Sequence, residues 1–255
     1  MKKVFYFFSL LSFLLLSCQD QEPEPLNIAV AANMQFAIKE IAQSFTEKTG
    51  TEVQLMISSS GKLNAQIKEG APYDVFVSAD MKYPQDLFEA GLAMEAPQIY
   101  AYGKLVLWSN MDGLEASINA LEDSNIKHIA LPNPKIAPYG AAAMEWIQHH
   151  GLEEVIQEKL VYGESISQCT QFILSKSAEI GFCSKSVVLS PQIEHLGSWI
   201  DLDTSLYSPI IQGMIVIKHR NSNRNSKNAM DFSKFLLSKE AQHILIKFGY
   251  SIKNQ

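Results

Sequence analysis

The sequence of 255 residues has few cysteines and fewer basic than acidic residues, and both scarcities limit what it can do. It contains three cysteines, and 21 Lys and Arg residues against 27 Asp and Glu residues give a formal net charge of −6. A negative balance argues against a basic nucleic-acid surface, and it means that local donors must hold any bound anion. No P-loop, GxSxG motif, internal repeat or Cys/His spacing typical of a zinc site is present.

The main apolar run is too short to span a bilayer and lies at the N-terminus. It extends from Val4 to Leu16 and follows two lysines, which is typical of a secretory signal. Leu15-Leu16-Ser17-Cys18 resembles the lipobox of bacterial lipoproteins, in which cleavage precedes a cysteine that then receives a lipid. We therefore predict a lipoprotein signal peptide at 1–17, lipidation of Cys18 and an acidic, proline-bearing tether at 18–25. An ordinary signal peptide is the alternative.

The two remaining cysteines, Cys169 and Cys183, lie in segments with an apolar pattern. They could pair in an oxidising compartment or remain buried free thiols.

Strands alternate with helices along the chain, which predicts an α/β fold with a parallel sheet. Apolar, β-branched runs indicate strands at about 26–32, 53–57, 73–80, 102–108, 128–131, 160–163, 179–183 and 207–217. Helices are expected between them, among others at 34–48 and 141–149. Ligands of such sheets bind outside the carboxyl ends of the strands. Four residues fall at such ends: Asn33, Ser60, Tyr139 and Ile166.

The most informative of these junctions is Ile57-Ser58-Ser59-Ser60-Gly61-Lys62, which leads from a strand into a short helix. Serine hydroxyls beside the unpaired N–H groups of a first helical turn form a seat for an anion. The simpler interpretation is an N-cap and a turn. Asn33 could likewise be only the N-cap of the helix that follows it.

Residues that could suggest an enzyme have simpler explanations. Asp74 and Asp80 could do acid–base chemistry, but we favour caps at strand ends. Ser60 could be a nucleophile, but no histidine lies at a strand end or in a motif where it could act as its base. We therefore predict that the protein is not an enzyme.

The order of these signals resembles the ModA family, the periplasmic molybdate-binding proteins of ABC importers. The resemblance rests on Ala29-Val30-Ala31-Ala32-Asn33, on Ser59-Ser60-Gly61-Lys62-Leu63, and on the run from Gly70-Ala71-Pro72 to Ser78-Ala79-Asp80. The Pro138-Tyr139-Gly140 turn and the closing segment at 241–250 extend it. It covers nearly all of residues 26–252.

The resemblance implies a two-lobed type II periplasmic-binding-protein fold with an oxyanion in the cleft between the lobes. Lobe one should comprise 26–104 plus 213–255 and lobe two 105–212, with hinges near Gly103-Lys104 and Ser208-Pro209. The family's ligand contacts fall on Asn33, Ser60, Tyr139 and Ile166, the last through its backbone N–H. Some members carry a ligand-contacting Tyr where Ser184 stands, so Ser184 is a candidate fifth contact.

The implied function is an extracytoplasmic, lipid-anchored receptor that captures molybdate, and also tungstate, and delivers it to the permease of an ABC transporter. Molybdenum is then bound as an oxyanion, without a cofactor or a metal cation, by a protein expected to be a monomer. A receptor for another tetrahedral oxyanion such as sulfate, and an anion-sensing signalling domain, remain alternatives. Lys62 beside Ser60 suggests an ion pair with the ligand, but we favour a solvated side chain.

Overall fold

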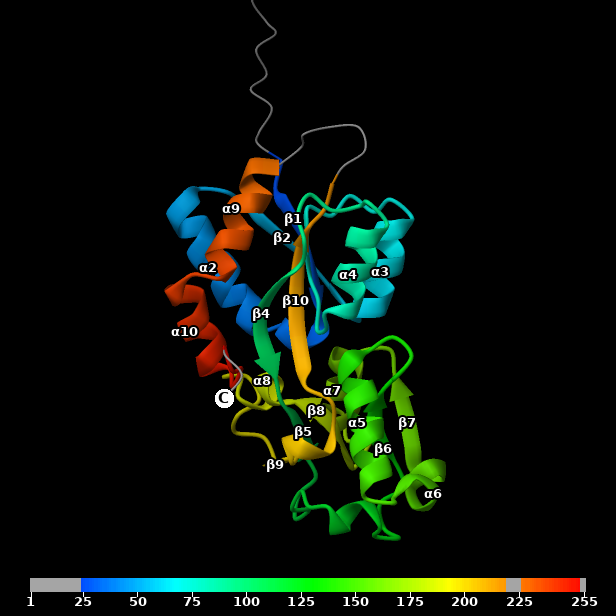
Figure 1. The fold of residues 1–255 in the computed structure, drawn as a ribbon. Coiled ribbons are helices and arrows are strands. Elements are labelled where there is room, and N and C mark those ends of the chain that lie inside the picture. The colour runs from blue at the N-terminus through cyan, green and yellow to red at the C-terminus, as the bar shows by residue number, and fades with distance from the viewer. Residues whose placement is uncertain (1–23, 219–225, 253–255) are drawn as a thin grey trace, which may run out of the picture.

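The computed structural model describes residues 24–218 and 226–252. The predicted signal peptide, Cys18 and most of the predicted tether lie outside the described residues. Two five-stranded sheets, each flanked by helices, form an upper and a lower body (Figure 1). We call the body around strands β1 to β4 and β10 lobe one, and the body around β5 to β9 lobe two.

Lobe one is built on a sheet with the strand order β2-β1-β3-β10-β4. Its strands are β1 (Leu26–Ala31), β2 (Val53–Ser58), β3 (Val75–Val77), β4 (Gln98–Gly103) and β10 (Ile210–Val216). Its helices are the 3-10 turn η2 (Ala32–Met34), α2 (Ala37–Thr49), α3 (Ser60–Lys68), α4 (Lys82–Glu89), α9 (Ser226–Leu236) and α10 (Lys239–Lys247).

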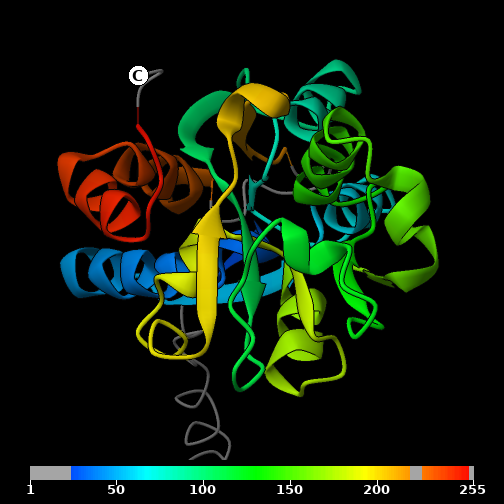
Figure 2. The ribbon, with the colours of Figure 1, turned by 90° about the horizontal axis from the view of Figure 1, so that it is seen from below.

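Alternation along the strands explains why helices cover both faces of this sheet. Side chains of a strand point alternately to opposite faces. Leu26, Ile28 and Val30 of β1 accordingly pack in the cluster that contains α2, α9 and α10, whereas Ala29 packs with α3 and α4. Figure 2 shows α2, α9 and α10 together on one side of the lobe. Helix α2 ends, as predicted, at Gly50, whose φ of 71° is left-handed.

Lobe two is built on a sheet with the strand order β7-β6-β8-β5-β9. Its strands are β5 (Leu105–Ser109), β6 (Ile129–Pro132), β7 (Leu160–Gly163), β8 (Ile180–Ser184) and β9 (Ser198–Asp201). Its helices are α5 (Pro138–His149), α6 (Glu153–Ile156), α7 (Ile166–Leu174) and α8 (Lys185–Val188), with the 3-10 turns η3 (Asn119–Leu121), η4 (Gln157–Lys159) and η5 (Thr204–Leu206). Its core contains the fully buried Trp108, Trp146 and Phe182.

Both sheets are mixed, so the prediction of a parallel sheet is only partly correct. In lobe one β1 is parallel to β2 and β3, but β10 is antiparallel to its neighbours β3 and β4. In lobe two β6 is parallel to β7 and β8, but β5 is antiparallel to β8 and β9. The chain enters β5 and β10 directly from the other lobe, whereas it enters the other strands of each sheet from within the same lobe. β5 and β10 are accordingly the strands that run antiparallel to their neighbours.

The chain crosses between the lobes at two places, after β4 and before β10. Lys104 alone separates β4 from β5, and residues 207–209 separate η5 from β10. The predicted hinges lie at these crossovers, and β10 belongs to the first sheet from Ile210 onward. The residue ranges of the lobes and the hinge motion remain predictions.

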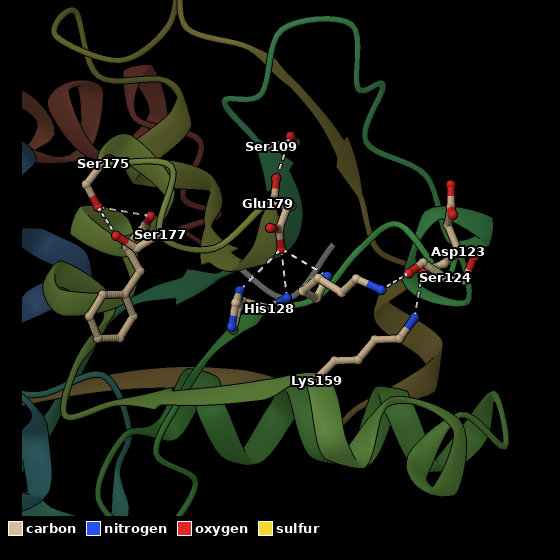
Figure 3. Close-up of polar contacts among 10 residues, drawn as sticks. Ser109, Asp123, Ser124, His128, Lys159, Ser175, Ser177 and Glu179 are labelled. Atoms are coloured by element: carbon tan, nitrogen blue, oxygen red, sulfur yellow. Dashed lines mark hydrogen bonds and ion pairs between the residues drawn. The ribbon is translucent and has the colours of Figure 1, made fainter.

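A polar cluster closes the end of lobe two that is remote from lobe one (Figure 3). The Glu179 carboxylate accepts hydrogen bonds from the backbone N–H groups of Lys127 and His128, and Ser109 Oγ donates to the Glu179 carbonyl at 2.7 Å. Lys159 Nζ donates to the carbonyls of Leu121 and Asp123. These bonds satisfy backbone groups where β6 begins and β5 ends, so we assign the cluster a structural role. Among the described residues no helix is long and apolar enough to cross a membrane.

Candidate functional site

One small cavity between the lobes brings together the four predicted contact residues. Asn33 reaches it from η2, Ser60 from α3, Tyr139 from α5 and Ile166 from α7. The rest of the lining comprises Ala31, Ala32, Ser59, Ala79, Ala137 and Pro138. Its volume is about 10 Å³, which is close to the space that a single water molecule needs. This is smaller than a ligand with four oxygen atoms, so residues that line the cavity must shift outward when such a ligand binds.

Three helices begin at this cavity with their N-termini toward it. Helix α3 begins at Ser60, α5 at Pro138 and α7 at Ile166, and they are 9, 12 and 9 residues long. The N–H groups of a first helical turn have no partner within the helix, and the helix dipole places partial positive charge there. Three such ends around one cavity make a site for an anion.

Helix α5 begins three residues earlier than predicted. Its first residue is Pro138, whereas the sequence suggested a start at Ala141. Proline suits the first helical position because its fixed φ is helical and the missing N–H would be unpaired there anyway. Tyr139 consequently lies in the first turn, where its backbone N–H belongs to the N-terminal group of donors.

Ser60 is buried and is held by a hydrogen bond from the Ala79 N–H to its Oγ, at 2.9 Å. Because the hydroxyl accepts this bond, its own proton stays available for a ligand. Its neighbour Ser59 is a residue that we missed. Ser59 is 3% exposed and lines the cavity, and its Oγ has no hydrogen-bond partner among the described residues. The run of three serines was the available signal.

Asn33 lies at the cavity, but not as the N-cap that the sequence suggested. It is inside η2, and the N-cap of α2 is Phe36. Its side chain is 2% exposed, and its Nδ2 donates to Gln212 Oε1 at 2.8 Å and to Tyr250 Oη at 2.9 Å. Its Oδ1 has no hydrogen-bond partner within the described part of the chain.

The candidate fifth contact, Ser184, does not line the cavity. Its buried Oγ lies 3.0 Å from Ser186 Oγ, and Ser186 in turn donates to the Asn33 carbonyl at 2.7 Å. Sequence position alone placed Ser184 in the site, and the geometry gives that placement no support.

None of the lining residues carries a charge, and three charged side chains near the cleft have other partners. Lys62 is exposed, as we favoured, and forms an ion pair with Glu164 of lobe two at 3.1 Å. Asp74 and Asp80 cap backbone groups as predicted, since Asp74 accepts from the Asn27 N–H and Asp80 from the Tyr83 N–H. Burial raises the pKa of Asp80. An anion here would be bound by neutral donors.

The lobes touch directly at the rim of the cavity. The Gly61 N–H of α3 donates to the Ile136 carbonyl of lobe two at 3.0 Å. Ser167 Oγ of α7 donates to Gln35 Oε1 of lobe one at 2.8 Å. These bonds join the two lobes, and the predicted hinge motion would require each of them to break or lengthen.

The cysteines and the acidic residues form neither a disulfide nor a metal-binding group in residues 24–218 and 226–252. Cys169 and Cys183 are buried free thiols, so the second of the two alternatives applies. No group of three or more His, Cys, Asp or Glu side chains able to hold a metal ion occurs in this part of the chain.

The chain is similar over most of its length to known binding proteins. The family model described as "Bacterial extracellular solute-binding protein" matches residues 26–251. The molybdate-binding protein ModA of Rhodobacter capsulatus is 40% identical over 223 residues, which cover 87% of this chain and 86% of that protein. ModA of Azotobacter vinelandii is 35% identical over 241 residues, or 94% of each chain. A solved structure of the Azotobacter vinelandii periplasmic molybdate-binding protein superposes with a TM-score of 0.83 at 33% identity, covering 90% of this chain and 100% of that one.

Proposed function

The chain belongs to the ModA family of bacterial extracellular solute-binding proteins, and from this premise we propose that it binds molybdate between its lobes and delivers it to the permease of an ABC importer. The resemblance predicted from sequence and the two-lobed α/β fold are confirmed. Its relatives are substrate-binding proteins of transport systems, not enzymes. An extracytoplasmic location follows from the family.

The observation that carries the proposal is the convergence of three helix N-termini on a cavity without charged side chains. A dianion held there needs no cation, because hydrogen bonds to a charged acceptor are strong and the helix ends add favourable potential. A tetrahedral dianion that carries no proton, such as molybdate, suits a site that offers donors.

We assign the contacts residue by residue. Ser60 donates its hydroxyl proton, since Ala79 already occupies the acceptor side of that hydroxyl. Tyr139 and Ile166 donate backbone N–H groups from the first turns of α5 and α7. Asn33 donates its carboxamide NH₂, and we add the buried, unpaired hydroxyl of Ser59 as a further donor.

The finer parts of the function belong to the proposal as well. Tungstate has the same charge and tetrahedral shape as molybdate, so the same donors should hold it. The Leu15-Leu16-Ser17-Cys18 motif supports a lipid anchor at Cys18 on a protein that acts as a monomer. Replacing Cys18 by Ser should abolish incorporation of labelled fatty acid, and size-exclusion chromatography with light scattering measures the mass.

Titration calorimetry with molybdate, tungstate, sulfate and phosphate tests the central claim. Molybdate and tungstate should bind, and sulfate and phosphate should bind far more weakly. Replacing Ser60 by Ala should weaken molybdate by one charged hydrogen bond, about 1.5–3 kcal/mol or roughly tenfold to 150-fold in Kd. Micromolar sulfate binding without a response to molybdate would refute the assignment and favour the alternative oxyanion receptor.

A further inference from the structure

Behind the cavity lies a buried network of side chains, which we call the amide network: Asn33, Tyr100, Tyr139, Gln212 and Tyr250. Gln212 is its centre. Its Oε1 accepts from Asn33 Nδ2 at 2.8 Å and from Tyr100 Oη at 2.6 Å, and its Nε2 donates to Tyr139 Oη at 3.2 Å. Gln212 thus links Asn33 of lobe one to Tyr139 of lobe two, two residues that line the ligand cavity.

The pairing of β10 with β4 is irregular next to Gln212. Gln212 pairs with Ala101 and Gly213 with Ile99, so Tyr100 of β4 is the extra residue of a bulge, and both Tyr100 and Gln212 are buried. A bulge of this kind re-aims a side chain, and such bulges are common next to functional sites. Gly103 of β4 leaves the space, because a Cβ there would lie 2.1 Å from Tyr139 Oη and 2.6 Å from Gln212 Nε2.

The Asn33 NH₂ group is not free to bind an anion in this structure. Its NH₂ is used by Gln212 and Tyr250, while its Oδ1 is buried without a partner in the described structure. A buried acceptor without a hydrogen bond costs about 1–3 kcal/mol, and a second acceptor beside it, such as an oxyanion, raises that cost. A half-turn of the carboxamide about the Cβ–Cγ bond exchanges Oδ1 and Nδ2 and removes the conflict.

This half-turn requires Gln212 to turn as well. With Asn33 alone reversed, its Oδ1 would face Gln212 Oε1, acceptor against acceptor. With both reversed, Gln212 Nε2 donates to Asn33 Oδ1, and Gln212 Oε1 accepts the proton of Tyr139 Oη. Tyr100 Oη has one proton for two acceptors, Gln212 Oε1 at 2.6 Å and the Ser78 carbonyl at 3.0 Å. After the reversal it donates only to the Ser78 carbonyl.

The rest of the network accommodates the reversal. Tyr250 Oη now accepts from Asn33 Nδ2, and its own proton has the Asn33 carbonyl and Ser186 Oγ as acceptors at 3.1 and 3.0 Å. After the reversal this proton turns to Asn33 Oδ1, and the Asn33 carbonyl keeps its bond from Ser186 Oγ. Burial raises the pKa of Tyr100, Tyr139 and Tyr250, so all three hydroxyls keep their protons at neutral pH.

We propose that Asn33 and Gln212 form a coupled amide pair that reverses when the anion binds, which makes Gln212 a positioning residue that turns the Asn33 NH₂ toward the ligand. The inference rests on the proposed function, since it assumes an oxyanion in the cavity.

Side-chain amide NMR of the ¹⁵N-labelled protein tests the reversal directly. Without ligand, the Asn33 NH₂ protons should show nuclear Overhauser contacts to the Tyr250 ring. Saturating molybdate should abolish these contacts, create contacts to the methyl groups of Ala31 or Ala79, and shift the Gln212 NH₂ signals in parallel. If the Asn33 contacts to Tyr250 persist at saturation, the inference is wrong.

A double-mutant cycle tests whether Gln212 acts through Asn33. Glutamate at 212 can only accept while ionised, so Gln212→Glu should hold the Asn33 NH₂ away from the ligand and weaken molybdate binding by more than tenfold. The added negative charge of Gln212→Glu also repels the anion. The same substitution in an Asn33→Ser background measures this repulsion alone, because a serine hydroxyl rotates freely and cannot be held in the wrong orientation. Non-additive losses support the pair. Equal losses in the two backgrounds contradict it.

Two controls keep the outcomes distinct. Gln212→Met removes the amide without adding charge and should weaken molybdate by about fivefold, whereas Gln43→Met on the exposed face of α2 should leave Kd unchanged. Thermal melts verify that each variant is folded. If the wild-type protein binds no molybdate, the proposed function fails, and the cycle is then run with whichever oxyanion binds. If it binds molybdate and Gln212→Met matches wild type, only the inference fails.

Discussion

Gly61 offers a way to separate ligand affinity from stability with a single methyl group. It lies in the first turn of α3, and its N–H donates across the cleft to the Ile136 carbonyl at 3.0 Å. A Cβ at this position would lie 3.0 Å from both Ile136 Cα and Ile136 O, and 2.7 Å from Tyr83 Oη. The Tyr83 hydroxyl can swing away, but Ile136 is backbone of lobe two. In Gly61→Ala the lobes must therefore stay a few tenths of an ångström further apart when closed.

The expected changes in affinity and stability have opposite signs. Closure should lose most of the Gly61 to Ile136 hydrogen bond and weaken the contacts around the ligand, together about 1–2 kcal/mol, or about five- to thirtyfold in Kd. The unliganded protein should gain about 0.5–1 kcal/mol, because Ala is a better helix former than Gly and the backbone here is helical.

Calorimetry with molybdate and chemical denaturation without ligand measure the two quantities. Ala65→Gly, on the exposed face of the same helix, is the matched control. It should lower stability and leave Kd unchanged. If Gly61→Ala binds molybdate as tightly as the wild-type protein, the closed arrangement of the lobes described here is not the arrangement that holds the ligand.

Three further predictions concern charged and ionisable groups. Lys62→Ala and Glu164→Ala should each weaken molybdate binding by less than about 1 kcal/mol, because the ion pair between these two residues is exposed. Added salt should remove this effect. A loss larger than that of Ser60→Ala would instead indicate a direct ion pair with the ligand. Asp80→Asn should raise the free energy of unfolding at pH 7, since burial penalises the carboxylate while Asn keeps the acceptor for the Tyr83 N–H. Because the pKa of Asp80 is raised in the folded protein, the free energy of unfolding of the wild-type protein falls as the pH rises above the unfolded value of 3.8. In thermal melts below that pH, the stability advantage of Asp80→Asn should therefore vanish. Burial raises the pKa of the Cys169 and Cys183 thiols to about 12, so in a Cys18→Ser protein Ellman's reagent at pH 8 should detect neither thiol before guanidinium unfolds the chain; rapid labelling of the folded protein would contradict this.

The candidate site could be proposed from the sequence because the relevant signals are local. A strand that ends in serines and enters a helix is visible within a few residues, and so Ser60 was predicted. The partners of these residues were not visible, because they lie far away in the chain. Asn33 bonds to Gln212 and Tyr250, which are 179 and 217 residues distant, and Lys62 pairs with Glu164 at a separation of 102.

Two further differences between the sequence analysis and the structure have the same origin. Ser184 was considered from its position in the family pattern, but its hydroxyl is engaged with Ser186 on the adjacent α8. Asn33 was interpreted as a cap because asparagine is a good N-cap, yet tertiary contacts place it in a 3-10 turn ahead of α2. Local propensity pointed to residues that line one cavity, but it did not show what each side chain bonds to.

The position of β10 in its sheet sets the order in which the protein can fold. Residues 105–209 supply every strand of lobe two as one continuous segment, so this lobe can form as soon as they are available. Lobe one cannot, because its sheet has β10 inserted between β3 and β4. Until a strand from the last quarter of the chain arrives, β3 and β4 have an unfilled gap between them. A protein secreted N-terminus first thus keeps its first 104 residues without a completed sheet until most of the chain has passed through the membrane, and this delay favours export in an unfolded state.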